Sequence, residues 1–162
     1  MLVLVSDTSV LIDLERGNLL ELAFQGPWSL AVPDLLYQRE LEPHNGAYLK
    51  GLGLGVLTLN GDESTFAQQV SGSCPKLSLP DCFALSLARR DDHVLLCGDG
   101  ALRQESGQQH VRCHGLLWLL DELLEHRPDL RTALREGLQI VAGHPRRRLP
   151  KHEVARRLTD WA

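Results

Sequence analysis

Two short apolar runs, each leading into an aspartate, constrain the fold of this chain more than any other feature. Residues 2–5 contain only leucine and valine and lead into Asp7, and the mainly apolar residues 93–97 lead into Asp99. Uninterrupted apolar runs of this length are typical of strands buried on both faces of a parallel sheet. Apolar residues at helical spacing follow the first run, so strands and helices are expected to alternate from the start of the chain.

The same alternation continues along the rest of the sequence. Short apolar runs predict further strands at residues 29–32, 56–59 and 111–113. Helices are predicted over residues 35–41, 79–90 and 116–126, after a cap at Asp62, and after Pro128 and Pro150. The glycine-rich residues 44–55 predict a loop or an irregular helix. Strands that alternate with helices predict an α/β domain with a largely parallel sheet.

Length and composition fit one globular domain with a sizeable core, since 43% of the 162 residues are hydrophobic. The longest apolar stretch, residues 115–120, is far shorter than the ~20 residues of a membrane helix. The N-terminus has neither the basic region nor the cleavage site of a signal peptide, so a cytoplasmic protein without a membrane segment is expected. The four cysteines form no CxxC pair, which argues against structural zinc and favours reduced, mostly buried thiols.

Basic residues are concentrated near the C-terminus, although the formal net charge is −4. We interpret residues 1–142 as the main domain and residues 143–162 as a basic helical extension that packs on the domain or trails from it. The extension can contact phosphate groups or form a solvated face, and charge runs are more often solvated. Its cationic side chains are Arg146, Arg147, Arg148, Lys151, Arg156 and Arg157.

Four acidic residues stand where a parallel sheet would gather them. Asp7 and Asp99 follow predicted strands, Asp81 lies near a helix start, and Glu40 lies in the helix after the second strand. Open α/β sheets bind ligands beyond the carboxyl ends of their strands, and carboxylates gathered there repel one another unless a cation lies among them. Each acid also has a purely structural explanation: Asp7 and Asp99 as helix N-caps, Asp81 in a capping box that starts at Ser78, and Glu40 as an exposed side chain.

The order of these motifs resembles that of the PIN-domain ribonuclease family, in particular its VapC-like toxin type. The likeness covers roughly residues 2–121 and is carried by SDTSVLIDL at 6–14, Glu-Leu at 40–41, LPDCFALSLA at 79–88 and LLCGDGALR at 95–103. It implies a three-layer α/β fold in which a central, mostly parallel sheet of about five strands is flanked by helices.

The resemblance also implies roles for individual residues. Ser9 matches a position that supports the site. Glu42 competes with Glu40 for the second acidic position, but Glu40 precedes Leu41 as in the family pattern. Cys97 stands where many relatives carry Thr or Ser. The implied catalytic acids are Asp7, Glu40, Asp81 and Asp99, and the implied metal ligands are Asp7, Asp81 and Asp99.

An all-oxygen site of this kind selects Mg²⁺ or Mn²⁺, which activate water and neutralise phosphate charge. We hypothesise hydrolysis of RNA phosphodiester bonds. Asp7 and Asp99 are the expected direct ligands, and Asp81 and Glu40 would hold coordinated waters or a second metal. Arg103, four residues after Asp99, is the candidate contact for the RNA substrate.

The predicted helix over residues 116–126 is a candidate surface for binding a second copy of the chain. A wide leucine stripe is expected to face inward, and Trp118 projects roughly opposite. An exposed tryptophan favours a homodimer interface, and coverage by the terminal helices is the alternative. Toxins of this family form dimers and are inhibited by a partner protein, so the resemblance leaves open that an antitoxin binds this chain. His110 and His114 are expected to be surface or packing residues. The stripe comprises Leu116, Leu117, Leu120, Leu123 and Leu124.

Two other functions are considered. A phosphatase of the haloacid-dehalogenase type also begins with a strand and an aspartate. That class needs a second aspartate two residues after the first, where this chain has Ser9. It also needs a lysine near a later motif, and no lysine closely precedes Asp99. A catalytically silent PIN-like module that binds protein or RNA is the other alternative. The presence of four acids argues against it.

Overall fold

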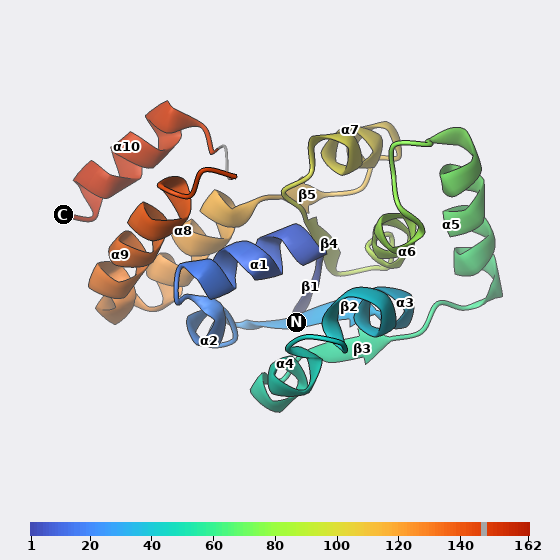
Figure 1. Ribbon diagram of the computed structural model, residues 1–162, viewed down its shortest axis with the longest axis horizontal. Coiled ribbons are helices and arrows are strands. Elements are labelled where there is room, and N and C mark those ends of the chain that lie inside the picture. The colour runs from blue at the N-terminus through green and yellow to red at the C-terminus, as the bar shows by residue number, and fades with distance from the viewer. Residues whose placement is uncertain (147–148) are drawn as a thin grey trace.

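A five-stranded, fully parallel sheet forms the centre of the computed structural model, which describes residues 1–146 and 149–162. The strand order is β3-β2-β1-β4-β5, and helices cover both faces of the sheet (Figure 1). This architecture confirms the predicted three-layer α/β fold. The strands are β1 (Leu2–Ser6), β2 (Trp28–Pro33), β3 (Gly55–Leu57), β4 (His93–Leu96) and β5 (Cys113–His114).

The central strand, β1, is buried on both faces. Leu4 is paired in register with Leu30 of β2 on one side and with Val94 of β4 on the other. The Leu4 side chain belongs to the hydrophobic cluster on one face of the sheet, and the Val5 side chain to the cluster on the other. Because both faces are covered by apolar groups, the strand is a continuous apolar run rather than an alternation of polar and apolar residues.

One face of the sheet is covered mainly by the N-terminal and C-terminal helices. Their buried leucines join Leu4 and Val94 in a single hydrophobic cluster. In Figure 1, α8, α9 and α10 lie together at the left of the molecule. The elements that contribute to this cluster are α1 (Thr8–Arg16), α2 (Leu20–Ala23), α3 (Asp34–Leu36), the π-helix η1 (Tyr37–Leu41), α4 (Gly46–Leu52), α8 (Leu116–His126), the short 3₁₀-helix η2 (Pro128–Leu130), α9 (Arg131–Ala142) and α10 (Lys151–Asp160).

The opposite face is covered by three helices from the middle of the chain, seen at the right of Figure 1. Their apolar side chains surround Val5 and Leu95 in the second hydrophobic cluster. Pro80 lies in the first turn of one of them, where the missing N–H of proline breaks no helical hydrogen bond. These helices are α5 (Gly61–Ser73), α6 (Leu79–Leu87) and α7 (Gly100–Gln108).

The path of the chain through the sheet creates one reversal point. The chain runs outward from β1 to β2 and β3, and then returns to the other side of β1 to form β4 and β5. Ligands of such sheets bind beyond the carboxyl ends of the two strands that flank the reversal. In this protein those strands are β1 and β4, and the residues that follow their ends include Asp7 and Asp99.

Several local expectations are wrong. Asn60, not Asp62, caps α5: its side chain accepts a hydrogen bond from the Glu63 N–H, and Glu63 bonds back to the Asn60 N–H. The glycine-rich segment contains a regular helix, α4, which ends at Gly53 with a φ of 114°, a value that glycine adopts without strain. The fully buried stripe of α8 includes Leu119, and two leucines expected in it are only partly buried. These are Leu117 and Leu124.

The C-terminal helix is attached to the rest of the protein by an arginine. Arg157 Nη2 lies 2.6 Å from Asp121 Oδ2 of α8, and its Nη1 donates to Glu153 Oε2 at 3.0 Å. The Arg157 side chain is only 11% exposed, so it belongs neither to a solvated face nor to a surface that contacts phosphate. The exposed cations of the segment are Arg146, Lys151 and Arg156, whereas Arg147 and Arg148 lie outside the described residues.

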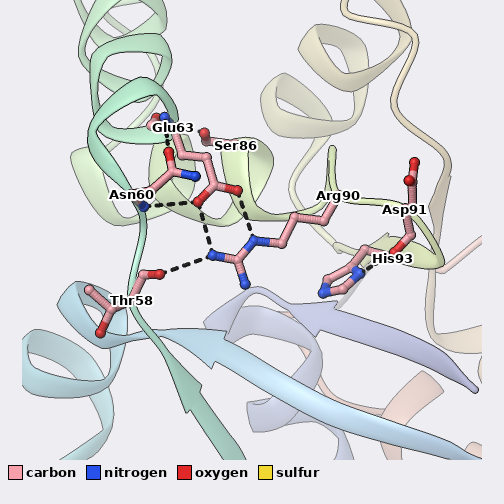
Figure 2. Close-up of polar contacts among 7 residues, drawn as sticks. All are labelled: Thr58, Asn60, Glu63, Ser86, Arg90, Asp91 and His93. Carbon is pink, nitrogen blue, oxygen red and sulfur yellow. Dashed lines mark hydrogen bonds and ion pairs between the residues drawn. The ribbon is translucent and has the colours of Figure 1, made fainter.

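A bidentate ion pair joins α5 to the turn that leads into β4 (Figure 2). Arg90 Nε donates to Glu63 Oε2 at 2.8 Å, and Arg90 Nη2 donates to Glu63 Oε1 at 2.9 Å. The same Nη2 also donates to the Thr58 carbonyl oxygen at 3.0 Å, next to the end of β3. The hydrogen bonds from Arg90 to the Glu63 carboxylate are the main cause that lowers the pKa of Glu63 from 4.5 to about 2. The pair therefore fixes the helix layer on this face to the edge of the sheet.

The lowered pKa of Glu63 makes its contribution to stability depend on pH. Because ionised Glu63 is favoured in the folded state, its stabilisation is complete above pH 4.5 and is lost as the pH falls towards 2. We expect Glu63→Gln to lower the free energy of unfolding by about 1–2 kcal/mol at pH 7, since the pair is partly solvent-screened. Urea unfolding from pH 7 to pH 2.5 should show the difference from wild type shrinking. Glu125→Gln, at an exposed position, is the control.

Candidate active site

The carboxylate of Asp7 lies at the reversal point of the sheet and is almost completely buried, with 2% of the residue exposed. Asp7 is the N-cap of α1, and its Oδ1 accepts a hydrogen bond from the Val10 N–H at 2.9 Å. Its Oδ2 accepts from Ser9 Oγ at 2.8 Å and from the Gly98 N–H at 3.0 Å. The capping role inferred from the sequence is therefore real, and it coexists with a position at the strand ends.

Ser9 reinforces the link between β1 and β4. Its Oγ donates to Asp7 and also accepts a hydrogen bond from the Gly98 N–H at 3.2 Å. Gly98 follows β4 by two residues, so the peptide that leads to Asp99 is held against the start of α1. This geometry fits the supporting role that the resemblance implies for Ser9.

Asp99 and Asp81 both stand in the first turns of helices on the same face of the sheet. Asp99 is the N-cap of α7, and its Oδ2 accepts from the Leu102 N–H at 3.0 Å. Asp81 is the third residue of α6, which is capped by Ser78: the Asp81 N–H donates to Ser78 Oγ at 3.2 Å. Asp99 is exposed and Asp81 is half-buried, so both carboxylates are accessible to a ligand.

Glu40 is positioned by the π-helix η1. The wide turn is closed by a hydrogen bond from the Glu42 N–H to the Tyr37 carbonyl, five residues back, at 2.8 Å. Thr8 Oγ1, in the first turn of α1, donates to Glu40 Oε2 at 3.0 Å. Glu42, the competing acid, is exposed. π-Helical turns are rare and are frequent at functional sites, and here the turn directs Glu40 towards the residue that follows Asp7.

Asp81 lies close enough to the other three acids for their negative charges to act on it. Burial is the main cause of the raised pKa of Asp81, and the negative charges of Asp7, Glu40 and Asp99 raise it further. Burial also raises the pKa of Asp7, against the hydrogen bonds that favour its ionised form. Carboxylates from four separate segments of the chain thus share one region at the carboxyl edge of the sheet.

The donor set of this region suits a hard divalent cation, because it offers carboxylate and hydroxyl oxygens. Among residues 1–146 and 149–162, no group of three or more His, Cys, Asp or Glu side chains is already arranged around a common ion position. Mg²⁺ is commonly bound by one or two carboxylates and several waters. An ion of this kind needs few protein ligands, and the carboxylates of Asp7 and Asp99 are the residues that would hold it.

Arg103 lies on the β5 side of this edge. Its Nη2 donates to the Cys97 carbonyl oxygen at 3.0 Å, and a Cβ built on Gly115 would lie 2.5 Å from the same nitrogen. The guanidinium thus lies between the end of β4 and the start of α8. Sequence reasoning missed Thr8, which bonds Glu40, and Gly98, which bonds Asp7, because both contacts join segments distant along the chain.

Comparison with known proteins agrees with this architecture. A family model described as DUF3368, PIN domain, matches residues 3–158, which include α10 as well as the sheet. A search among curated proteins finds no match to the chain. No helix in the described part of the chain is long and apolar enough to cross a membrane. Because the family match spans nearly the whole chain, the chain belongs to the PIN-domain family.

Proposed function

We propose that this protein is a Mg²⁺- or Mn²⁺-dependent endoribonuclease that hydrolyses RNA phosphodiester bonds. The observation that carries the proposal is geometric: acidic side chains from four separate segments lie at the reversal point of the sheet. Their negative charges add to the burial that raises the pKa of Asp81. Like charges gathered in a half-buried region destabilise one another, and a bound cation is the usual compensation. Membership of the PIN-domain family, whose members are generally nucleases, supports the same conclusion.

In this proposal the four acids divide into two pairs. Asp7 and Asp99 hold the ion directly, and Ser9 fixes the orientation of the Asp7 carboxylate. When bound, the ion would lower the pKa of a coordinated water and offset the charge of the phosphate. A carboxylate oxygen of Asp81 or Glu40 accepts a hydrogen bond from the attacking water and orients it towards phosphorus.

The proposal extends to a toxin-type role, with a homodimer in the cytoplasm and an antitoxin protein as inhibitor. A cavity of about 750 Å³ between α1 and η1 borders Glu40 and is lined by Leu11, Ile12 and Arg39. Ile12 is 42% exposed and offers an apolar contact at the cavity wall. An inhibitor seated there would lie beside the acids.

Replacement of Asp7 tests catalysis directly. We expect Asp7→Asn to lower the initial rate of Mn²⁺-dependent cleavage of single-stranded RNA by at least about 100-fold, because one direct ligand loses its charge. Circular dichroism should show an intact fold. Asp91→Asn, at an exposed position in a turn, is the matched control and should cleave like wild type. Cleavage that persists in EDTA or in the Asp7 variant contradicts the proposal, and RNA binding without turnover supports the silent module.

Asp81 allows the metal to be tested without RNA. Its raised pKa means that the ionised form is disfavoured in the fold, so this penalty grows as the pH rises above 3.8 and is present at pH 7. Without divalent ions, Asp81→Asn should raise Tm by a few degrees, which corresponds to a gain on the order of 1 kcal/mol in the free energy of unfolding. With Mg²⁺ or Mn²⁺, the wild type should gain more Tm than the variant. An equal gain in both proteins would exclude Asp81 from the ion's surroundings.

The homodimer is tested by size-exclusion chromatography with light scattering. We expect a mass of twice the 18.1 kDa of the chain at micromolar concentration. A mass of one chain over the whole concentration range would remove the homodimer from the proposal, with no effect on the proposed chemistry.

A further inference from the structure

A second cavity, of about 430 Å³, opens beside the acids on the β5 side. Its volume lies within the range of small-ligand sites, which is roughly 300–1,000 Å³. Gly98 belongs to its wall and also donates its N–H to Asp7, so the cavity and the acidic region share a boundary. Other wall residues are Arg103, Cys113, His114, Trp118 and Leu149.

The cavity contains a pair of stacked aromatic rings. The centroids of His114 and Trp118 lie 4.2 Å apart, and the ring planes differ by only 10°. Burial lowers the pKa of His114, and the positive charges of Arg112 and Arg103 lower it further against the charge of Glu122, which favours the uncharged ring. Trp28 and Trp161 are buried in the core, whereas Trp118 is half-buried. The pair therefore presents an uncharged, planar surface at the cavity wall.

Arg103 supplies a positive charge at the same wall. Its guanidinium is held by the Cys97 carbonyl and lies against Gly115, which lacks a side chain that would displace it. A guanidinium carries five donors in a plane and can bond base edges or phosphate oxygens with those that face the cavity. The wall thus combines a planar apolar surface with a cation, next to a region of carboxylates.

We propose that this cavity binds one unpaired nucleobase of the RNA strand, stacked on the Trp118–His114 pair, beside the phosphate to be cut. The proposal rests on the proposed ribonuclease function. Aromatic side chains bind single-stranded RNA by stacking, with little preference among bases. Because the cavity adjoins the acids at Gly98, the bound base occupies a fixed place relative to the cleavage position. A base held in a duplex cannot enter, so single strands are preferred.

An abasic scan of the substrate tests this without altering the protein. A single-stranded RNA octamer with one cleavage position is made as a series, each member lacking one base. Binding to the wild type is measured by fluorescence anisotropy in EDTA, and cleavage is measured separately in Mn²⁺. We expect one position, fixed relative to the cut, at which loss of the base weakens binding by about 5- to 100-fold. A flat scan with normal cleavage overturns the base site and leaves the nuclease intact.

Variants of Trp118 give the second test. Trp118→Leu should weaken binding of the intact octamer by a similar factor and remove the position effect, whereas Trp118→Phe should retain both. Quenching of tryptophan fluorescence by RNA should survive Trp28→Phe and disappear in Trp118→Phe. A position effect on binding without cleavage would leave the base site standing and refute the nuclease, and no binding of any RNA refutes both. A change of oligomeric state in Trp118→Leu with unchanged RNA binding makes this face a protein interface.

Discussion

The hydrogen bond from the Gly98 N–H to Asp7 Oδ2 joins the ends of β1 and β4, the two strands between which the chain reverses direction. A buried carboxylate is tolerated only when hydrogen-bond donors surround it, and Val10 and Ser9 supply the others. The same contacts start α1 and hold the peptide that leads to Asp99. One side chain thus links the ends of β1 and β4 to the start of α1.

The gathering of acids at this edge opposes stability. Asp7 and Asp81 both have raised pKa values, with burial as the larger cause, and neighbouring negative charges add to it at Asp81. The rest of the fold contains the opposite arrangement: Glu63 and Arg90 form a bidentate pair that lowers the pKa of the acid. Two of the carboxylates at the strand ends are thus held in unfavourable surroundings, as is common where a site is shaped by function rather than by stability.

The sequence predicts the layers of this fold well because the signals are local. The apolar run at residues 2–5 becomes β1, and the helix predicted over 116–126 has the bounds of α8. Weak signals fail: β5 covers only Cys113–His114, displaced from the run at 111–113, because a two-residue edge strand is defined by its partner. Asn60 caps α5 because its side-chain oxygen accepts a hydrogen bond from the Glu63 N–H. The sequence does not distinguish Asn60 from Asp62, because both residue types are favoured caps.

The candidate site could be predicted only in part, since its geometry depends on long-range contacts. Asp7 and Asp99 can be placed from the strands before them. The bond from Thr8 to Glu40, the stack of His114 on Trp118 and the pairing of Arg157 with Asp121 leave no trace in residue spacing. The roles of the four acids in catalysis and metal binding stay predictions.

The π-turn at Tyr37–Leu41 has a consequence for how this site can change over time. A π-turn corresponds to one residue inserted into an α-helix, and each residue of an α-helix turns the chain by about 100°. Loss of a single codon there would let the segment relax to ordinary helical winding and swing the Glu40 side chain away from Thr8. The sheet and the second hydrophobic cluster, to which no residue of this turn belongs, would keep their contacts. A deletion of one residue would therefore remove Glu40 from the acidic region while the parallel sheet is kept.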